Sequence, residues 1–184
     1  NFNPTDFIDS KEARKMARFT QLAVCAAKMA LEDSNLTENQ EVLEDAGVFL
    51  GVGIGGFEVT ESSYKSYFNS NYTRVAPLTI PEIISNEAAG NICIVNHIHG
   101  PAHTICTACA SGTDAIGTAF DQIRSGRLDV VLAGGTESAV NGFTNLSFGV
   151  LQALSSKWVD EPTKASRPFD KDRDGFVMGE GATI

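Results

Sequence analysis

Apolar and polar side chains follow two different periods along this chain. Residues 10–33 carry apolar side chains at steps of three and four, which predicts a helix with one buried face and Ser10 as its N-cap. Residues 47–53 and 129–133 are short, almost continuous apolar runs, typical of strands buried inside a parallel sheet. Another helix is predicted to follow the small residues after position 107 and to end at Gly126. Its predicted buried face consists of Ile116, Ala119, Phe120 and Ile123.

Glycines, prolines and polar loops divide the rest of the chain into shorter elements. Because the predicted strands and helices alternate, the fold class is α/β with right-handed crossovers. We find no internal repeat and no linker that would split the chain into two domains. The remaining predicted helices cover residues 58–68, 82–94 (opened by Pro81) and 141–154, and the remaining strands cover residues 103–107 and 176–184.

The composition excludes several classes of protein. The chain has 184 residues, of which 42% are hydrophobic and 20% charged, an ordinary globular balance. No apolar run approaches 18 residues, so we expect no membrane span. A net charge of -9 argues against nucleic acid as a partner, because phosphate contacts need clustered Lys and Arg.

The four cysteines fall into two pairs with different surroundings. Cys25 and Cys93 lie among apolar residues, which predicts buried structural thiols. Their spacing is not that of a secreted disulfide framework, so we expect a reducing compartment. Cys106 and Cys109 form a C-x-x-C pair. A zinc site would need a second pair, and a thioredoxin-like pair needs its first cysteine at a helix start, whereas Cys106 falls inside the predicted strand.

Two glycine- or aspartate-rich motifs suggest other chemistry. Gly51-x-Gly53-x-x-Gly56 fits a dinucleotide fingerprint, but residues 70–74 form a loop where the confirming acidic residue should end a strand. A tight strand-to-helix turn explains these glycines equally well. The aspartates of residues 170–175 resemble the start of an EF-hand loop, but its twelfth position is Gly181 rather than glutamate. We therefore expect a solvated loop there, and no metal site.

Cys109 stands where a predicted strand passes into a helix through small residues. The small neighbours leave its sulfur accessible, and the positive end of the following helix stabilises a thiolate. A backbone N–H at such a turn can also stabilise an oxyanion on an attached acyl group. These features predict a covalent thiol catalyst on an α/β scaffold. A dyad between Cys109 and His103 is conceivable, although neighbours on one strand usually diverge and His103 is more typical of a packing residue.

Three segments carry a resemblance to a known family. These segments are T-A-C-A-S-G at residues 107–112, A-G-G-T-E at residues 133–137, and A-S-R-P-F-D-K-D-R-D-G-F at residues 165–176. With them the chain resembles the condensing enzymes of fatty-acid synthesis, the β-ketoacyl-acyl carrier protein synthases, from Lys11 onward almost without gaps.

The resemblance implies a fold and an activity. The implied fold is thiolase-like, with α-β-α-β-α layers and two similar halves, in a homodimer. The implied reaction transfers an acyl chain from acyl carrier protein to Cys109 and condenses it with malonyl-carrier protein, with loss of CO2. The resemblance implies no cofactor and no metal, and a location in the cytoplasm or in an organelle that synthesises fatty acids.

The resemblance also assigns binding residues. Ile54 and Phe148 match positions that line the acyl pocket, and Thr79 matches a pocket position supplied by the partner subunit. Gln152 departs from the pattern, because close relatives carry a basic carrier-protein contact there. The remaining carrier-protein contacts match Lys11, Arg14, Lys15 and Arg74. A basic row on a chain of charge -9 is consistent with an acidic partner.

The resemblance further implies that residues 1–184 form most of an N-terminal synthase half, truncated at both ends. The family's two catalytic histidines and its lysine would follow Ile184, so we expect this chain alone to be inactive in condensation. Two other functions stay open: a non-catalytic half that pairs with a separate chain, and a C-x-x-C thiol oxidoreductase.

Overall fold

The computed structural model describes residues 2–184, and these form two compact units. The first unit runs to Ser138 and includes Gly181–Ile184; the second unit is Ala139–Glu180. Within the described residues, no helix is both long and apolar enough to cross a bilayer.

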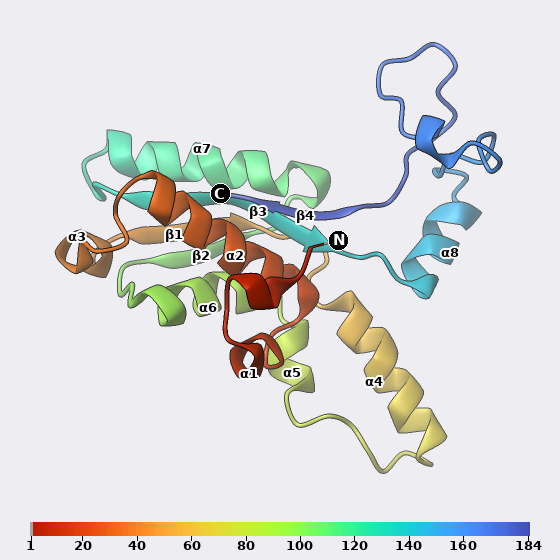
Figure 1. Cartoon of the computed structure of the whole chain (residues 1–184), viewed down its shortest axis with the longest axis horizontal. Helices are drawn as coiled ribbons and strands as arrows, with labels where there is room; N and C mark the ends of the chain where they lie inside the picture. The colour runs from red at the N-terminus through yellow and green to blue at the C-terminus, as the bar shows by residue number, and fades with distance from the viewer. Residues whose placement is uncertain (1) are drawn as a thin grey trace. The chain divides into compact units, whose positions relative to one another are not determined.

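A four-stranded sheet in the order β2-β1-β3-β4 forms the centre of the first unit (Figure 1). Strand β1 pairs in parallel with β2 on one side and with β3 on the other. Thr136 Oγ1 donates to the Gly181 carbonyl, and Gly134 lies against Thr183, so β3 and β4 run antiparallel. The predicted α/β class is confirmed, with a mixed rather than a purely parallel sheet. The strands are β1 Gly47–Gly51, β2 Ala102–Ile105, β3 Val131–Ser138 and β4 Glu180–Thr183.

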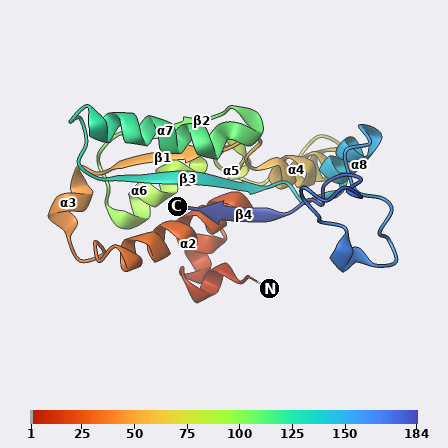
Figure 2. The same cartoon turned by 90° about the horizontal axis from the view of Figure 1, so that it is seen from above.

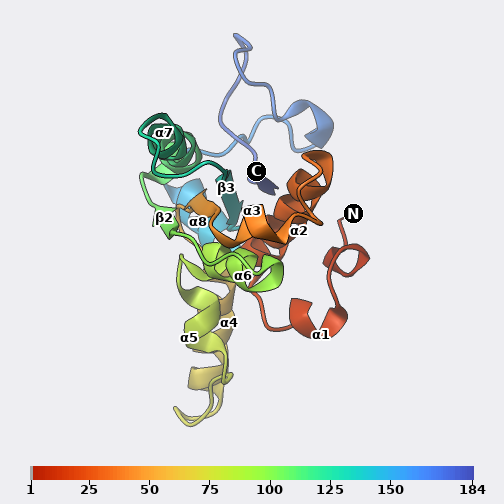
Figure 3. The same ribbon diagram turned by 90° about the vertical axis from the view of Figure 1, so that its left-hand side faces the viewer.

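Helices cover both faces of this sheet. Helix α7 (Ser111–Arg124) lies on one face, and α2 (Arg18–Asp33) and α6 (Glu87–Asn96) lie on the other (Figures 2 and 3). All five residues of β1 are buried, as its continuous apolar run predicts. The largest fully buried side chains between the sheet and α2 and α6 include Phe19, Leu50 and Ile92.

The helix predicted over residues 10–33 is wrong as a single element. The structure has α1 (Ser10–Ala13), capped by Asp9 rather than Ser10, and then α2 from Arg18. The chain breaks because two carboxylates take the backbone N–H groups at the junction. The Ala17 N–H donates to Glu87 Oε1 at 3.3 Å, and the Arg18 N–H donates to Glu58 Oε1 at 3.0 Å.

Glu87 is a buried acid at the start of α6. It is 6% exposed, and its Oε2 accepts a hydrogen bond from Thr20 Oγ1 at 2.6 Å. Burial raises the pKa of Glu87 to about 7; the hydrogen bonds from Thr20 and Ala17 oppose this shift, and the charges of Glu82 and Glu58 add to it. Deprotonating Glu87 in the folded state is therefore unfavourable.

Glu87 predicts that stability depends on pH. The folded protein binds this proton more tightly than the unfolded chain, so its stabilisation is complete below pH 4.5 and is lost as pH rises to about 7. Between pH 4.5 and about pH 7 the wild type should lose about 2 kcal/mol of unfolding free energy through Glu87. In Glu87→Gln we expect this loss to be absent. Urea unfolding at pH 5 and pH 8 measures it, with exposed Glu38→Gln as the control. An unchanged pH dependence in Glu87→Gln would refute the assignment.

The buried face predicted for α7 is confirmed at Ala119 and wrong at its other three positions. Ile116, Phe120 and Ile123 are 55%, 60% and 46% exposed, whereas Ala115 and Ala119 are buried. The helix packs its small side chains, not its large ones, against the strands. The reason is close approach: Gly51 of β1 leaves no room for a side chain beneath Ser111.

The remaining helices of the first unit differ from prediction mainly at their ends. The helix predicted over residues 58–68 is confirmed as α4. The helix predicted over residues 82–94 is replaced by two, because Pro81 lies inside a short helix and the chain turns before Glu87. The elements are η1 Pro4–Asp6, α3 Gln40–Glu44, α4 Phe57–Asn69, α5 Thr79–Ile83 and η2 Ala108–Ala110.

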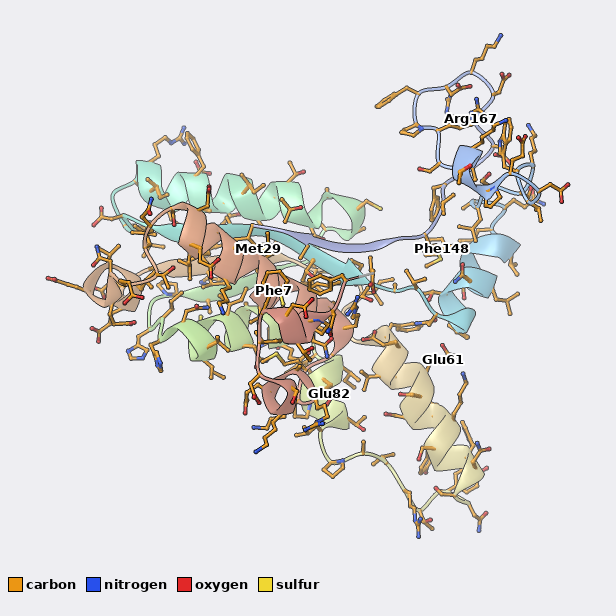
Figure 4. The ribbon with its side chains drawn as sticks, in the orientation of Figure 1. Phe7, Met29, Glu61, Glu82, Phe148 and Arg167 are labelled. Atoms are coloured by element: carbon orange, nitrogen blue, oxygen red, sulfur yellow. The ribbon has the colours of Figure 1, made fainter. Side chains whose placement is uncertain are left out.

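The second unit contains one helix and a hydrogen-bonded loop. Helix α8 (Gly142–Val150) is the helix predicted over residues 141–154; it has Asn141 as its N-cap and ends four residues earlier than predicted. The 3-10 turn η3 (Pro162–Lys164) interrupts the long polar loop. The rings of Phe148 and Phe176 meet edge to face at 5.2 Å between centroids. Both Phe148 and Arg167, labelled in Figure 4, belong to this unit.

Candidate active site

Cys109 lies in η2, the single turn that joins β2 to α7, and its side chain is exposed. The preceding residue, Ala108, has a φ of 52°, a left-handed conformation that is uncommon for any residue except glycine. A turn in which the Ala110 N–H donates to the Thr107 carbonyl at 3.1 Å reverses the chain around Cys109. Strained backbone at an exposed thiol before a helix is the geometry of a nucleophile elbow.

Ser111 holds this turn in place from its buried position at the start of α7. Its Oγ accepts a hydrogen bond from the Thr107 N–H at 2.9 Å and donates to the Ala108 carbonyl at 2.6 Å. It is 4% exposed and satisfies both backbone groups away from water. The strained residue before Cys109 is thus fixed from both sides.

Cys106 lies one residue beyond β2, whereas the strand predicted over residues 103–107 would have included it. Its thiol is exposed and donates to the Gly53 carbonyl at a sulfur–oxygen distance of 3.6 Å. Cys25 is buried, as predicted, whereas Cys93, which was also predicted to be buried, is half-buried. Burial raises the pKa of both of these thiols, which disfavours their reactive thiolate forms.

The glycines at Gly51, Gly53 and Gly56 do not form a phosphate cradle. Three successive N–H groups of this loop donate to the carboxylate of Glu137 at the end of β3: Gly53 at 3.0 Å, Ile54 at 2.8 Å and Gly55 at 3.2 Å. A dinucleotide pyrophosphate needs those donors for itself. Sterics explain these glycines instead. A Cβ on Gly51 or Gly56 would overlap neighbouring backbone, and a Cβ on Gly53 would lie 2.9 Å from Glu137 Oε2. Our sequence reasoning missed Glu137, which lies 82 to 84 residues from its donors.

The aspartates of residues 170–175 hold the second unit's loop together. Asp174 accepts hydrogen bonds from Ser155 Oγ at 2.7 Å and from two backbone N–H groups at 2.8 Å. The Ser155 hydroxyl and the N–H groups of Lys157 and Ser156 lower the pKa of Asp174 to about 2. Within the described residues, no group of three or more His, Cys, Asp or Glu side chains could hold a metal ion.

His103 packs against an aromatic ring. Its imidazole lies 5.1 Å from the Phe49 ring centroid, across the paired strands β2 and β1. This contact is the packing role that its place on a strand suggested.

The predicted pocket residues come from three different elements. Ile54 follows β1 and is 38% exposed, and Thr79 begins α5, where its hydroxyl meets that of Ser63 at 3.1 Å. Both belong to the first unit, as Cys109 does, while Phe148 lies on α8 of the second unit. The loop of Ile54 contacts the segment that leads into the Cys109 turn, because the carbonyl of the neighbouring Gly53 accepts a hydrogen bond from the Cys106 thiol.

The predicted carrier-protein contacts near the start of the chain do not share one helix, because α1 ends at Ala13. Lys15 pairs with Glu12 at 2.7 Å. Arg74 lies on the exposed loop between α4 and α5. The exposed basic side chains at the start of the chain are Lys11, Arg14 and Lys15.

The sheet, the strained turn and the exposed thiol define an α/β protein with an accessible cysteine at the start of a helix. Residues 2–184 match the family model of the beta-ketoacyl synthase N-terminal domain. The chain therefore belongs to the beta-ketoacyl synthase family.

Similar proteins and structures are ketosynthases. The chain is 42% identical over its whole length to 3-oxoacyl-[acyl-carrier-protein] synthase 2 of Synechocystis sp., of which it covers 44%. A beta-ketoacyl synthase from Burkholderia phymatum superposes with a TM-score of 0.82 and 32% identity, over 99% of this chain and 44% of that one. A type II polyketide ketosynthase, solved with its acyl-carrier protein and bound to the hexaketide, gives a TM-score of 0.82 and 29% identity, over 90% of this chain and 42% of that one. The chain thus spans less than half of these relatives, which share the thiolase-like fold.

Proposed function

We propose that the protein containing this chain is a 3-oxoacyl-acyl carrier protein synthase with Cys109 as its nucleophile. The observation that carries the proposal is the exposed Cys109 thiol on a strained turn at the start of α7, in a chain of the beta-ketoacyl synthase family. Relatives that match this chain over its whole length carry the name 3-oxoacyl-[acyl-carrier-protein] synthase 2.

The proposed reaction has two steps at Cys109. First, the Cys109 sulfur attacks the thioester carbonyl of an acyl-carrier protein; the carbonyl–sulfur bond to the carrier breaks, and the carrier leaves as the thiol with the cysteine proton. Second, malonyl-carrier protein loses CO2, and the resulting carbanion forms a carbon–carbon bond with the acyl group as the Cys109 thioester breaks. The product is a 3-oxoacyl group on the second carrier, and the backbone N–H at the turn is an oxyanion donor.

The proposed partner is acyl carrier protein, bound through Lys11, Arg14, Lys15 and Arg74. All four side chains are exposed, on a chain whose net charge is -9. A basic patch on an acidic protein favours an acidic partner and repels basic ones. One of the similar ketosynthases was solved in complex with its acyl-carrier protein. Complex formation should weaken as salt rises from 50 to about 500 mM, and salt-independent binding would contradict this footprint.

A homodimer is the proposed assembly, and α4 supports it. This helix has no buried residue and extends from the sheet beside α5 (Figure 1). Its end carries a cluster of touching, exposed aromatic rings, which soluble proteins usually cover. The cluster consists of Tyr64, Tyr67, Phe68 and Tyr72. Sedimentation velocity of the protein at micromolar concentration should give twice the monomer mass, and a monomer would contradict the assembly.

We place the protein in a reducing compartment, the cytoplasm or an organelle that synthesises fatty acids. All four cysteines are free thiols in the structure, and two of them are exposed. Exposed thiol nucleophiles need such surroundings to stay reduced.

A labelling experiment tests the proposed nucleophile. We expect incubation with an acyl thioester to add one acyl group, and fragmentation of the labelled peptide to assign it to Cys109. Cys106→Ser should label within about twofold of the wild type, because a serine hydroxyl can still donate to the Gly53 carbonyl that accepts from the Cys106 thiol. An acyl group on Cys106 would contradict Cys109 as the nucleophile, and loss of activity in Cys106→Ser is the result that the C-x-x-C oxidoreductase predicts.

A further inference from the structure

We propose that Glu137 is a positioning residue that fixes the loop of Gly53, Ile54 and Gly55 against the nucleophile turn. Three successive N–H groups of this loop donate to its carboxylate at 2.8 to 3.2 Å, two to Oε2 and one to Oε1. Glu137 itself is half-buried at the end of β3, behind the loop. The role in acyl placement rests on the proposed function, whereas the hydrogen bonds do not.

The loop needs an anion to hold this shape. Converging backbone N–H groups form a positively polarised concavity, and charge-assisted hydrogen bonds are the strong ones. Gly55 has a φ of 75°, and a Cβ on Gly53 would lie 2.9 Å from Glu137 Oε2. The loop is thus built around the carboxylate, with glycines where the chain must turn and approach it closely.

The other side of the loop touches the nucleophile turn. The Gly53 carbonyl accepts the Cys106 thiol at 3.6 Å, and a Cβ on Gly53 would lie 3.7 Å from the Ala108 carbonyl oxygen. Ile54, the proposed acyl-pocket residue, directly follows Gly53 and is 38% exposed. Glu137 therefore determines where Ile54 lies relative to Cys109, without touching the substrate.

The arrangement also determines which role the N–H groups of this loop have. Since its N–H groups face Glu137, they are not oxyanion donors for an acyl group on Cys109. The exposed group that this loop presents is the apolar Ile54 side chain, which suits an acyl chain better than a phosphate.

Variants of Glu137 test the proposal in the full-length protein. In Glu137→Ala we expect acylation of Cys109 by a hexadecanoyl thioester to slow by about 100-fold, since small displacements remote from the reacting atoms have effects of this size. Alkylation of Cys109 by iodoacetamide, which needs no pocket, should change less than about threefold. Glu137→Gln should fall in between, because its one carbonyl oxygen can still accept from Gly53 and Ile54.

Rescue by a small anion provides the sharper readout. We expect 100 mM acetate, against chloride at equal ionic strength, to restore hexadecanoyl transfer in Glu137→Ala by at least fivefold. Amide hydrogen exchange of residues 53–55 should accelerate in Glu137→Ala and slow again with acetate. An equal loss of acylation and alkylation together with a lowered melting temperature, or wild-type acylation in Glu137→Ala, would overturn the positioning role. Failure of the wild type itself to acylate Cys109 would instead refute the proposed function, and the exchange measurement still tests the loop.

Discussion

Replacing Cys109 with alanine is expected to abolish acyl labelling and to reduce acyl transfer by at least about 10³-fold. No other exposed thiol lies on a strained turn at a helix start within the described residues, and Cys25 and Cys93 are not exposed. The loss should be purely chemical, because an exposed side chain on a turn contributes little to folding. Intact mass after incubation with an acyl thioester measures the label, and a malonyl-dependent condensation assay of the full-length protein measures transfer.

The fold of the variant provides the control. The melting temperature of Cys109→Ala should stay within about 2 °C of the wild type, since the turn is held by Ser111 rather than by the thiol. Cys109→Ser keeps the side-chain volume but offers a much weaker nucleophile, so it should also be inactive. Residual transfer above about 10% of the wild-type rate in either variant would contradict the assignment of Cys109.

The local parts of this molecule could be predicted from the sequence, and for physical reasons. Strand β1 is an apolar run with both faces buried, so its pattern reports its environment directly. Cys109 could be singled out because small residues between a strand and a helix are themselves what makes a thiol accessible. In both cases the deciding interactions are within a few residues along the chain.

Interactions between distant residues could not be predicted in the same way. Residues 10–33 have an unbroken helical pattern, yet Glu87 and Glu58 take the N–H groups of Ala17 and Arg18 and divide the helix. The loop of Gly53 to Gly55 looks like a phosphate cradle until Glu137 is seen to occupy its donors. In both cases the acidic partner is distant in the sequence, so the local pattern around the N–H groups does not predict it.

The exposed face of α7 shows a third limit of pattern reading. A periodic apolar row predicts that a face is covered but does not identify what covers it. Here the sheet contacts the small residues Ala115 and Ala119, and the row with Ile116 and Phe120 is open to solvent within this chain. The contact is decided by distance: only small side chains fit where α7 begins directly above a glycine of β1.

Replacing that glycine is therefore expected to have the largest effect on folding. A Cβ on Gly51 would overlap the carbonyl carbon of Ser111 and the amide nitrogen of Gly112. These are backbone atoms, so no side-chain rotation can relieve the overlap, and α7 itself must move. We expect Gly51→Ala to cost at least about 4 kcal/mol, above the usual range for overpacking.

A glycine further along α7 serves as the matched control for Gly51→Ala. A Cβ added to Gly117 would have no neighbouring atom within 4 Å, so Gly117→Ala should stabilise the helix by up to about 1 kcal/mol. Chemical denaturation of both variants gives the comparison, and acyl labelling gives a second one. Because the start of α7 holds the turn of Cys109 through Ser111, any folded Gly51→Ala protein should label more slowly, while Gly117→Ala should label normally. Wild-type stability and labelling in Gly51→Ala would mean that the close packing of α7 on β1 does not determine the position of Cys109.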